Sequence, residues 1–167
     1  SRCTTDGLSS FVGELYQIVL ERVVTPDQKK GLLERYLGFL LGQGAAFDIQ
    51  NFIPIHAQLF ALTPSDRLFS ILQNAANHSP DAIKTWTGCL EDAVTEVSDK
   101  LRIAKIYTTL ADCYKNILKD PEKTADAYEN LLKASPDSLS AFKECFEAME
   151  QVGRYFDCTE IARSFAL

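Results

Sequence analysis

Apolar residues recur at steps of three and four along almost the whole chain, and no other feature constrains its fold as strongly. In LSSFVGELYQIVLERVV (8–24), one such stripe comprises Leu8, Phe11, Val12, Leu15, Ile18, Val19 and Val23. This spacing places side chains on one face of a helix. No run rich in Val, Ile and Thr alternates with period two, and no Asn-Gly or Asp-Gly turn joins alternating segments. The sequence therefore predicts an all-α fold.

Four short polar phrases indicate where helices begin. TPDQ, SPDA, DPEK and SPDS start at Thr25, Ser79, Asp120 and Ser135. A Ser, Thr or Asp side chain accepts a hydrogen bond from the free N–H groups of a first helical turn, and Pro at the next position loses no hydrogen bond there. We therefore expect an N-cap at each of the four positions.

The caps and the apolar stripes together predict about nine helices. Their expected ranges are 7–23, 26–42, 48–62, 65–77, 80–97, 100–118, 121–134, 138–151 and 154–166. Pro54 lies inside the third range, so either it kinks that helix or the helix starts there. The connections are short, so sequential helices are expected to pack as antiparallel neighbours.

The composition is that of a chain with a real core. Of its 167 residues, 46 % are apolar and 24 % are charged, and the net charge is −6. This length suffices for one compact domain or a short repeat array. An acidic chain without a Lys/Arg run lacks the footprint of a nucleic-acid binder. No apolar run reaches the roughly 18 to 20 residues that span a bilayer, so we expect no membrane span.

The cysteine pattern predicts reduced, structural thiols and no metal site. The five cysteines, Cys3, Cys89, Cys113, Cys145 and Cys158, are widely spaced, and no CxxC occurs. Neither His56 nor His78 stands at zinc-site spacing from a cysteine. Free thiols fit a cytoplasmic or nuclear location.

A specific internal pattern appears in the last third. In IYTTLADCYKNILKDPEKTADAYENLLKASPDS (106–138), its members are Tyr107, Leu110-Ala111 and Tyr114 on a first helix, then Ala125, Tyr128, Leu131 and Pro136. The spacing resembles the tetratricopeptide repeat, a helix-turn-helix unit of about 34 residues. Thr124 stands where the family has a small Ala, and the turn at Lys119-Asp120 is one residue longer.

A second, weaker unit follows. Its matching positions are Phe142, Cys145-Phe146, Met149, Gly153-Arg154-Tyr155, Cys158, Ala162 and Phe165. Phe146 departs from the pattern, which has Gly or Ala there. The resemblance covers residues 103–167 and implies antiparallel helix pairs stacked as a right-handed α-solenoid. We extend this architecture to one helical-repeat domain over 1–167, with degenerate pairs in 1–80 and repeats resembling the family in 81–167.

The resemblance also implies a concave groove, lined by the first helices of the repeats, that takes a peptide or a partner helix. The matching positions are Lys105, Thr108, Asp112, Lys115, Asn116, Lys143, Glu147, Glu150 and Gln151. Chaperone-binding members of the family grip a carboxylate with Lys, Asn and Arg. Because Asp112 and Glu147 stand where those members carry Asn, we expect a basic or polar segment instead. The alternative is that all nine are ordinary solvated residues.

A search for chemistry finds no catalytic or cofactor motif. GxSxG, HExxH, GxxxxGK[ST] and GxGxxG are all missing. His56 lies among apolar residues, which favours a partly buried, hydrogen-bonded histidine over a general base, and His78 is expected in an exposed loop or as a partner of the dipole at a helix C-terminus. The sequence therefore predicts no catalytic residues, no cofactor and no enzymatic activity.

The predicted function is a protein-protein interaction scaffold. The chain starts without Met and ends inside an apolar pattern, which indicates a piece of a longer protein. Alternatives are an accessory helical domain of a larger enzyme, a helical-repeat subunit of a large complex and, disfavoured by charge, an RNA-binding repeat. The apolar stretch FIPIHAQLFALTPSDRLFSIL (52–72) is expected to pack against a further domain or to form an assembly interface.

Overall fold

The computed structural model of the chain describes residues 3–23, 25–44, 47–77 and 79–165, and the side chains within those ranges from residue 11 onward. This part of the chain is all-α and contains no strand. The α-helices are α1 (Cys3–Arg22), α2 (Pro26–Leu41), α3 (Ile49–Leu62), α4 (Asp66–Ala75), α5 (Pro80–Val94), α6 (Lys100–Asp112), α7 (Pro121–Ala134), α8 (Leu139–Gln151) and α9 (Tyr155–Phe165). The predicted helices are therefore confirmed, with boundaries that differ by a few residues.

Two of the four predicted N-caps are formed by the expected side chains. Thr25 Oγ1 accepts from the Gln28 N–H at 3.4 Å, at the start of α2. Asp120 Oδ1 accepts from the Lys123 N–H at 3.0 Å, at the start of α7. Each bond satisfies one of the free N–H groups of a first turn.

The other two predicted caps need correction. Ser79 occupies the N-cap position of α5, but its side chain makes no capping bond. Ser135 is the C-cap of α7. The N-cap of α8 is Ser138, whose Oγ accepts from the Ala141 N–H at 3.2 Å. The SPDS phrase therefore contains the cap at its last residue, and its first residue ends the preceding helix.

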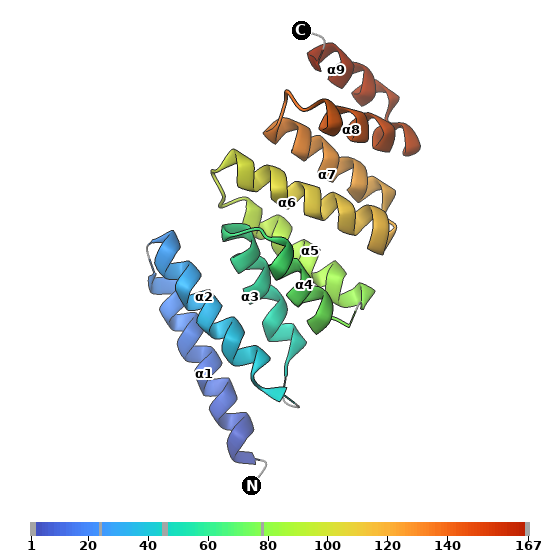
Figure 1. Ribbon diagram of the computed structural model, residues 1–167. Helices are drawn as coiled ribbons and strands as arrows, with labels where there is room; N and C mark the ends of the chain where they lie inside the picture. The colour runs from blue at the N-terminus through green and yellow to red at the C-terminus, as the bar shows by residue number, and fades with distance from the viewer. Residues whose placement is uncertain (1–2, 24, 45–46, 78, 166–167) are drawn as a thin grey trace.

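The helices follow one another along an elongated body, with the two termini at opposite ends (Figure 1). α1 packs on α2 and α2 on α3, while α6 packs on α7, α7 on α8 and α8 on α9. The expectation that sequential helices are neighbours fails in one place, because α5 packs chiefly on α3 and not on α4. The short α4 packs against α3 instead.

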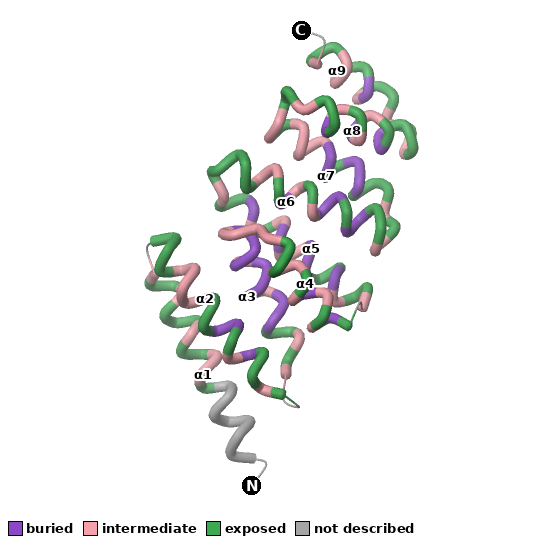
Figure 2. Tube along the Cα trace, viewed as in Figure 1, coloured by how far each residue is buried: buried purple, intermediate pink, exposed green. Residues whose placement is uncertain are grey.

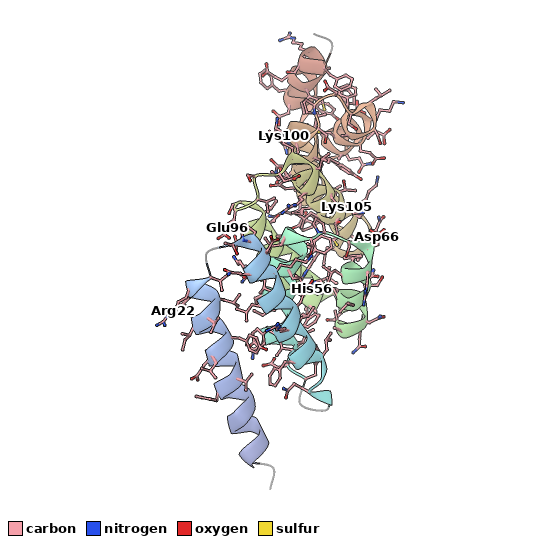
Figure 3. The ribbon with its side chains drawn as sticks, turned by 60° about the vertical axis from the view of Figure 1, so that its left-hand side comes forward. Arg22, His56, Asp66, Glu96, Lys100 and Lys105 are labelled. Carbon is pink, nitrogen blue, oxygen red and sulfur yellow. The ribbon has the colours of Figure 1, made fainter. Side chains whose placement is uncertain are left out.

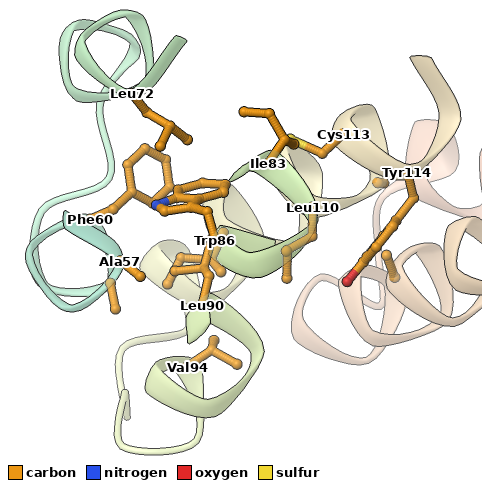
Figure 4. Packing of buried hydrophobic residues seen from close by; sticks show 14 of the residues in the cluster. Ala57, Phe60, Leu72, Ile83, Trp86, Leu90, Val94, Leu110, Cys113 and Tyr114 are labelled. Atoms are coloured by element: carbon orange, nitrogen blue, oxygen red, sulfur yellow. The ribbon is translucent and has the colours of Figure 1, made fainter. Parts of the chain in front are cut away.

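The core is centred on α3 and α5. Figure 2 shows buried segments running through α3, α5 and α6. Trp86 of α5 is completely buried, and its ring lies 5.3 Å from that of Phe60 and 5.8 Å from that of Phe69 (Figure 4). The apolar stretch 52–72 is thus used within this chain: its buried members include Phe52, Ile53, Ile55, Leu59, Phe60 and Leu72.

Pro54 lies inside α3, so the alternative that the helix starts at this residue is wrong. The helix begins at Ile49, after Asp48, whose Oδ1 accepts from the Gln50 N–H at 2.9 Å. Proline in a helix interior removes one backbone hydrogen bond. The burial of the α3 side chains offsets that loss.

The sixth predicted helix contains a change of helix type. After α6 the chain continues as a π-helical turn, η2 (Cys113–Leu118), and ends with Lys119 in the left-handed conformation, at a φ of 55°. A π-turn closes its hydrogen bonds over one residue more than an α-turn. The six residues Cys113–Leu118 therefore end the sixth predicted helix with a wider turn than that of an α-helix.

Candidate functional site

The side chain of His56 is completely buried, and both its ring nitrogens are hydrogen-bonded. Nδ1 accepts from the Trp86 indole N–H at 3.0 Å, and Nε2 lies 2.8 Å from the Leu68 carbonyl oxygen, to which it donates. Burial lowers the pKa of His56 to about 4. The predicted hydrogen bonding of His56 is confirmed, whereas its burial is complete and not partial; with both nitrogens bonded inside the core, the ring is not placed to act as a general base. The expectation for His78 lies outside the described residues.

All nine residues predicted to line a groove are exposed. Lys105, Thr108 and Asp112 come from α6, Lys115 and Asn116 from η2, and Lys143, Glu147, Glu150 and Gln151 from α8. A salt bridge joins the two groups, because Lys115 Nζ lies 2.9 Å from Glu144 Oε2 on α8. The structure thus brings η2 and α8 together at one point.

Two of the lysines on this face, Lys105 and Lys115, form ion pairs within the chain. Lys105 Nζ lies 2.9 Å from Asp66 Oδ1 at the start of α4, a pair that is labelled in Figure 3. The pKa of the Asp112 carboxyl is raised, mainly by burial and also by the nearby Glu144. The positive charges of Lys115 and Lys105 act in the opposite direction and lower this pKa. Asp112 therefore lies among lysines and another acid, and does not present an isolated negative charge to a basic segment.

Two matching clusters of Tyr, Glu and Lys join the α6–α7 hairpin to its neighbours. In the first, Glu91 of α5 accepts from the Tyr114 hydroxyl at 2.8 Å and from Lys123 Nζ at 3.0 Å. Lys123 Nζ also lies 5.8 Å from the centre of the Tyr114 ring. The acid comes from the helix before the hairpin, and the other two residues come from its two arms.

The second cluster has the same composition with the roles exchanged along the chain. Glu144 of α8 pairs with Lys115 at 2.9 Å, and Lys115 Nζ lies 5.7 Å from the centre of the Tyr128 ring, whose pKa is raised by burial and by the nearby Glu144. Here the acid comes from the helix after the hairpin. The Lys115 ammonium group therefore connects η2 to α8, and it is less available to pair with an acidic group of a partner.

A cleft of about 910 Å³ lies elsewhere, over α3 and between α2 and α5. Pro54, Gln58, Ala61 and Leu62 of α3 line it along one helix face, and Cys89, Asp92 and Ala93 of α5 form the facing wall. The start of α2 and the residues that join α5 to α6 complete the rim. Small side chains at Ala61 and Ala93 leave room between the helices.

The rim of this cleft is charged and predominantly acidic. Lys29 Nζ lies 3.3 Å from Glu96 Oε2, and the Arg102 guanidinium lies 3.9 Å from Asp99. Asp92 lines the same cleft, and among the described residues its carboxylate has no ion-pair partner. The cleft thus combines the apolar side chains of Pro54, Ala61 and Leu62 with the amide of Gln58 and with one exposed carboxylate, Asp92, that lacks an ion-pair partner among the described residues.

Cys89 is the only thiol in the lining of this cleft, and it is not activated. Burial raises its pKa, and the nearby Asp92 carboxylate raises it further. A nucleophilic cysteine needs a lowered pKa, since the thiolate is the reactive form. The cleft therefore offers a ligand apolar contacts and the negative charge of Asp92, and no activated thiol.

The sequence held no signal for this cleft. Its walls come from three helices and a connection, and Ala61 and Ala93 fit the ordinary apolar stripes of packed helices. The cleft arises because α5 packs on α3, and the sequence did not reveal that pairing.

No three His, Cys, Asp or Glu side chains in the described ranges are placed to hold a metal ion. Within the same ranges, no helix is long and apolar enough to cross a membrane. In comparisons with known proteins, no family model, no curated protein and no solved structure matches the chain.

Proposed function

We propose that this chain is a non-enzymatic protein-interaction scaffold, and that the cleft over α3 binds a polypeptide segment of its partner. The observation that carries the proposal is that one cleft of about 910 Å³ brings together apolar side chains of α3 and α5, the Gln58 amide and an acid, Asp92, without an ion-pair partner among the described residues. An apolar surface with a few placed polar groups is typical of a binding site.

The lining defines the chemistry of the segment. Leu62, Ala93 and Pro54 offer apolar contact, so the segment places one apolar stripe on α3 and α5. Asp92 favours a Lys or Arg at the edge of that stripe, because an opposite charge steers association and fixes the orientation of the segment. The partner is therefore a short amphipathic segment with a basic residue.

The architecture that suits this role is the solenoid that the resemblance implies. Linear packing of α6 to α9 supports that proposal, as does the burial of Leu110, Ala111, Ala125 and Tyr128 at repeat-like positions. The free thiols of Cys89, Cys113, Cys145 and Cys158 support a location in the cytoplasm or nucleus.

Selection from a displayed library of short helical peptides tests the proposal. Peptides that bind the wild-type chain are expected to share an apolar stripe and a Lys or Arg, and to lose binding to Asp92→Lys and to Ala93→Leu. Asp137→Lys is the matched control, because it reverses an exposed acid outside the cleft. Retained binding by both cleft variants would contradict the proposal.

The same peptides distinguish the cleft from the face of α6 and α8. A double variant, Asp112→Lys with Glu147→Lys, reverses the two acids that the family resemblance places in a groove. Loss of binding in this double variant, with normal binding by Asp92→Lys, would move the site to that face.

A further inference from the structure

One face of α1 is apolar and uncovered. The side chains of Phe11, Leu15, Ile18 and Val19 are 57, 44, 48 and 44 % exposed. Their spacing places them together along the helix. Among the described residues the other exposed large apolar side chains are scattered over the ends of several elements: Leu41, Leu101, Leu139, Tyr155 and Phe156. The α1 stripe is therefore the one extended apolar patch in the described part of the chain.

This stripe is distinct from the side of α1 that packs on α2. On that second side the Tyr16 ring stacks on the Tyr36 ring, at 4.4 Å and 6°, and a Cβ at Gly13 would lie 3.0 Å from the Tyr36 hydroxyl. The α2 contact thus uses a different part of the helix surface. α1 has two apolar sides, of which the described part of the chain covers one (Figure 1).

The charges beside the stripe are complementary to those of a second copy. Glu14 precedes Ile18 by four residues and Arg22 follows it by four, and neither has an ion-pair partner among the described residues. Figure 3 shows Arg22 directed away from the body of the protein. Each of these residues lies about 6 Å along the helix axis from Ile18.

If a twofold axis passes through Ile18, Glu14 and Arg22 can both form ion pairs with the second copy. Two antiparallel copies of α1 related by such an axis place Glu14 of each copy at the level of Arg22 of the other, so that two opposite-charge pairs flank the apolar contact. A parallel arrangement in register would place like charges side by side. Closed twofold symmetry is also the commonest arrangement of homo-oligomers.

We propose that the exposed stripe of α1 is a dimer interface, in which α1 of a second copy packs antiparallel with Ile18 at the twofold axis. One helix face is smaller than the roughly 800 Å² per partner of a standard interface. The dimer is therefore weak, with a micromolar dissociation constant. This interface does not depend on the cleft over α3.

Sedimentation velocity over a concentration series tests the interface directly. The wild-type chain is expected to pass from monomer to dimer, and Ile18→Glu to remain monomeric. Leu101→Glu is the matched control, because Leu101 is 83 % exposed on α6, and this variant is expected to dimerise normally. Circular dichroism of Ile18→Glu checks that its helix content is unchanged, as expected for a surface position.

Cross-linking tests the antiparallel geometry. In a chain that carries Cys3→Ser and Cys89→Ser, Ile18→Cys is expected to form a disulfide-linked dimer on mild oxidation, since the two residues meet at the axis. Gln17→Cys lies about 100° round the helix and is expected to cross-link at least about tenfold more slowly. Glu14→Arg and Arg22→Glu are each expected to weaken the dimer, and their combination to restore it.

Two results would overturn the proposal. One is a wild-type chain that stays monomeric up to a concentration of about 1 mM, well above a micromolar dissociation constant. The other is a dimer that Ile18→Glu leaves intact, or that Leu101→Glu disrupts to the same extent.

Discussion

The Trp86 indole N–H donates a hydrogen bond of 3.0 Å to Nδ1 of His56, a ring that is itself completely buried. Because Nδ1 accepts, the proton of the neutral ring is on Nε2, which donates to the Leu68 carbonyl. One histidine thereby links α3, α4 and α5. It explains how the short α4 is held although α5 packs chiefly on α3.

Acid is expected to weaken the fold through His56. Its pKa is about 4 in the folded chain and about 6.5 in an unfolded one, so the unfolded chain binds a proton first as the pH falls. The stabilisation is complete above pH 6.5 and is lost between about pH 6.5 and 4, for a total of about 3 kcal/mol. Urea unfolding across this range measures the loss.

His56→Gln is the control for this pH dependence, since it removes the titrating ring. Its free energy of unfolding is expected to be lower at pH 7 and nearly level between pH 6.5 and 5. A wild-type curve that is level over the same range would show that His56 does not titrate as described.

The Tyr114 cluster predicts a measurable cost for losing Glu91. Glu91→Ala leaves the buried Tyr114 hydroxyl without its 2.8 Å acceptor and Lys123 without its ion pair. We expect this substitution to lower the free energy of unfolding by about 1–2 kcal/mol. Glu122→Ala, an exposed acid in the first turn of α7, is expected to cost much less. Denaturant unfolding of both variants makes the comparison, and equal costs would contradict the role given to Glu91.

Loss of the Arg154 side chain is expected to destabilise α9 without unfolding the rest of the protein. Its guanidinium lies within 2.8 Å of carboxylates of Asp126, Glu129 and Asp157, and so connects α7 to α9. Removal by Arg154→Ala is expected to lower the hydrogen-exchange protection of α9 amides several-fold while α3 amides remain unchanged. Arg154→Lys should restore it only in part, because one ammonium cannot match three carboxylates. Equal loss in α3 would indicate global unfolding instead.

The described thiols are expected to react in a definite order. Burial raises the pKa values of Cys113 and Cys145 to about 12, and both are fully buried, whereas Cys89 is partly exposed in the cleft. Iodoacetamide under native conditions should therefore alkylate Cys89 first, more slowly than free cysteine because its own pKa is also raised. Peptide mass mapping over time records the order, and faster labelling of Cys113 would contradict the packing of η2.

The starts of individual helices could be predicted from the sequence, but which helix faces pack against each other could not. The start of α2 follows from Thr25 and that of α7 from Asp120, because a cap acts within one turn. The prediction of an N-cap at Ser135 was wrong. Ser135 and Ser138 both fit the N-cap pattern, and only the position at which α7 ends decides between them.

The candidate sites depended on longer-range information. The nine residues predicted to line a groove are exposed, yet Lys105 pairs with Asp66, 39 positions away, and Lys115 with Glu144. No sequence spacing indicates such pairs. The α1 stripe was visible as an apolar pattern, but the pattern does not tell which members face α2 and which, like Ile18, remain uncovered.

The order in which the helices pack has a consequence for how the chain folds. Most contacts join elements that are close in sequence, so little loop entropy is lost before packing begins, and a chain of this kind has a low contact order. Folding can nucleate at the α3–α5 core and spread outward in both directions. α1, which packs chiefly on α2, and α9, which packs chiefly on α8, lie outside that core and are expected to dock late, so the interface proposed on α1 would form on a helix that adapts easily.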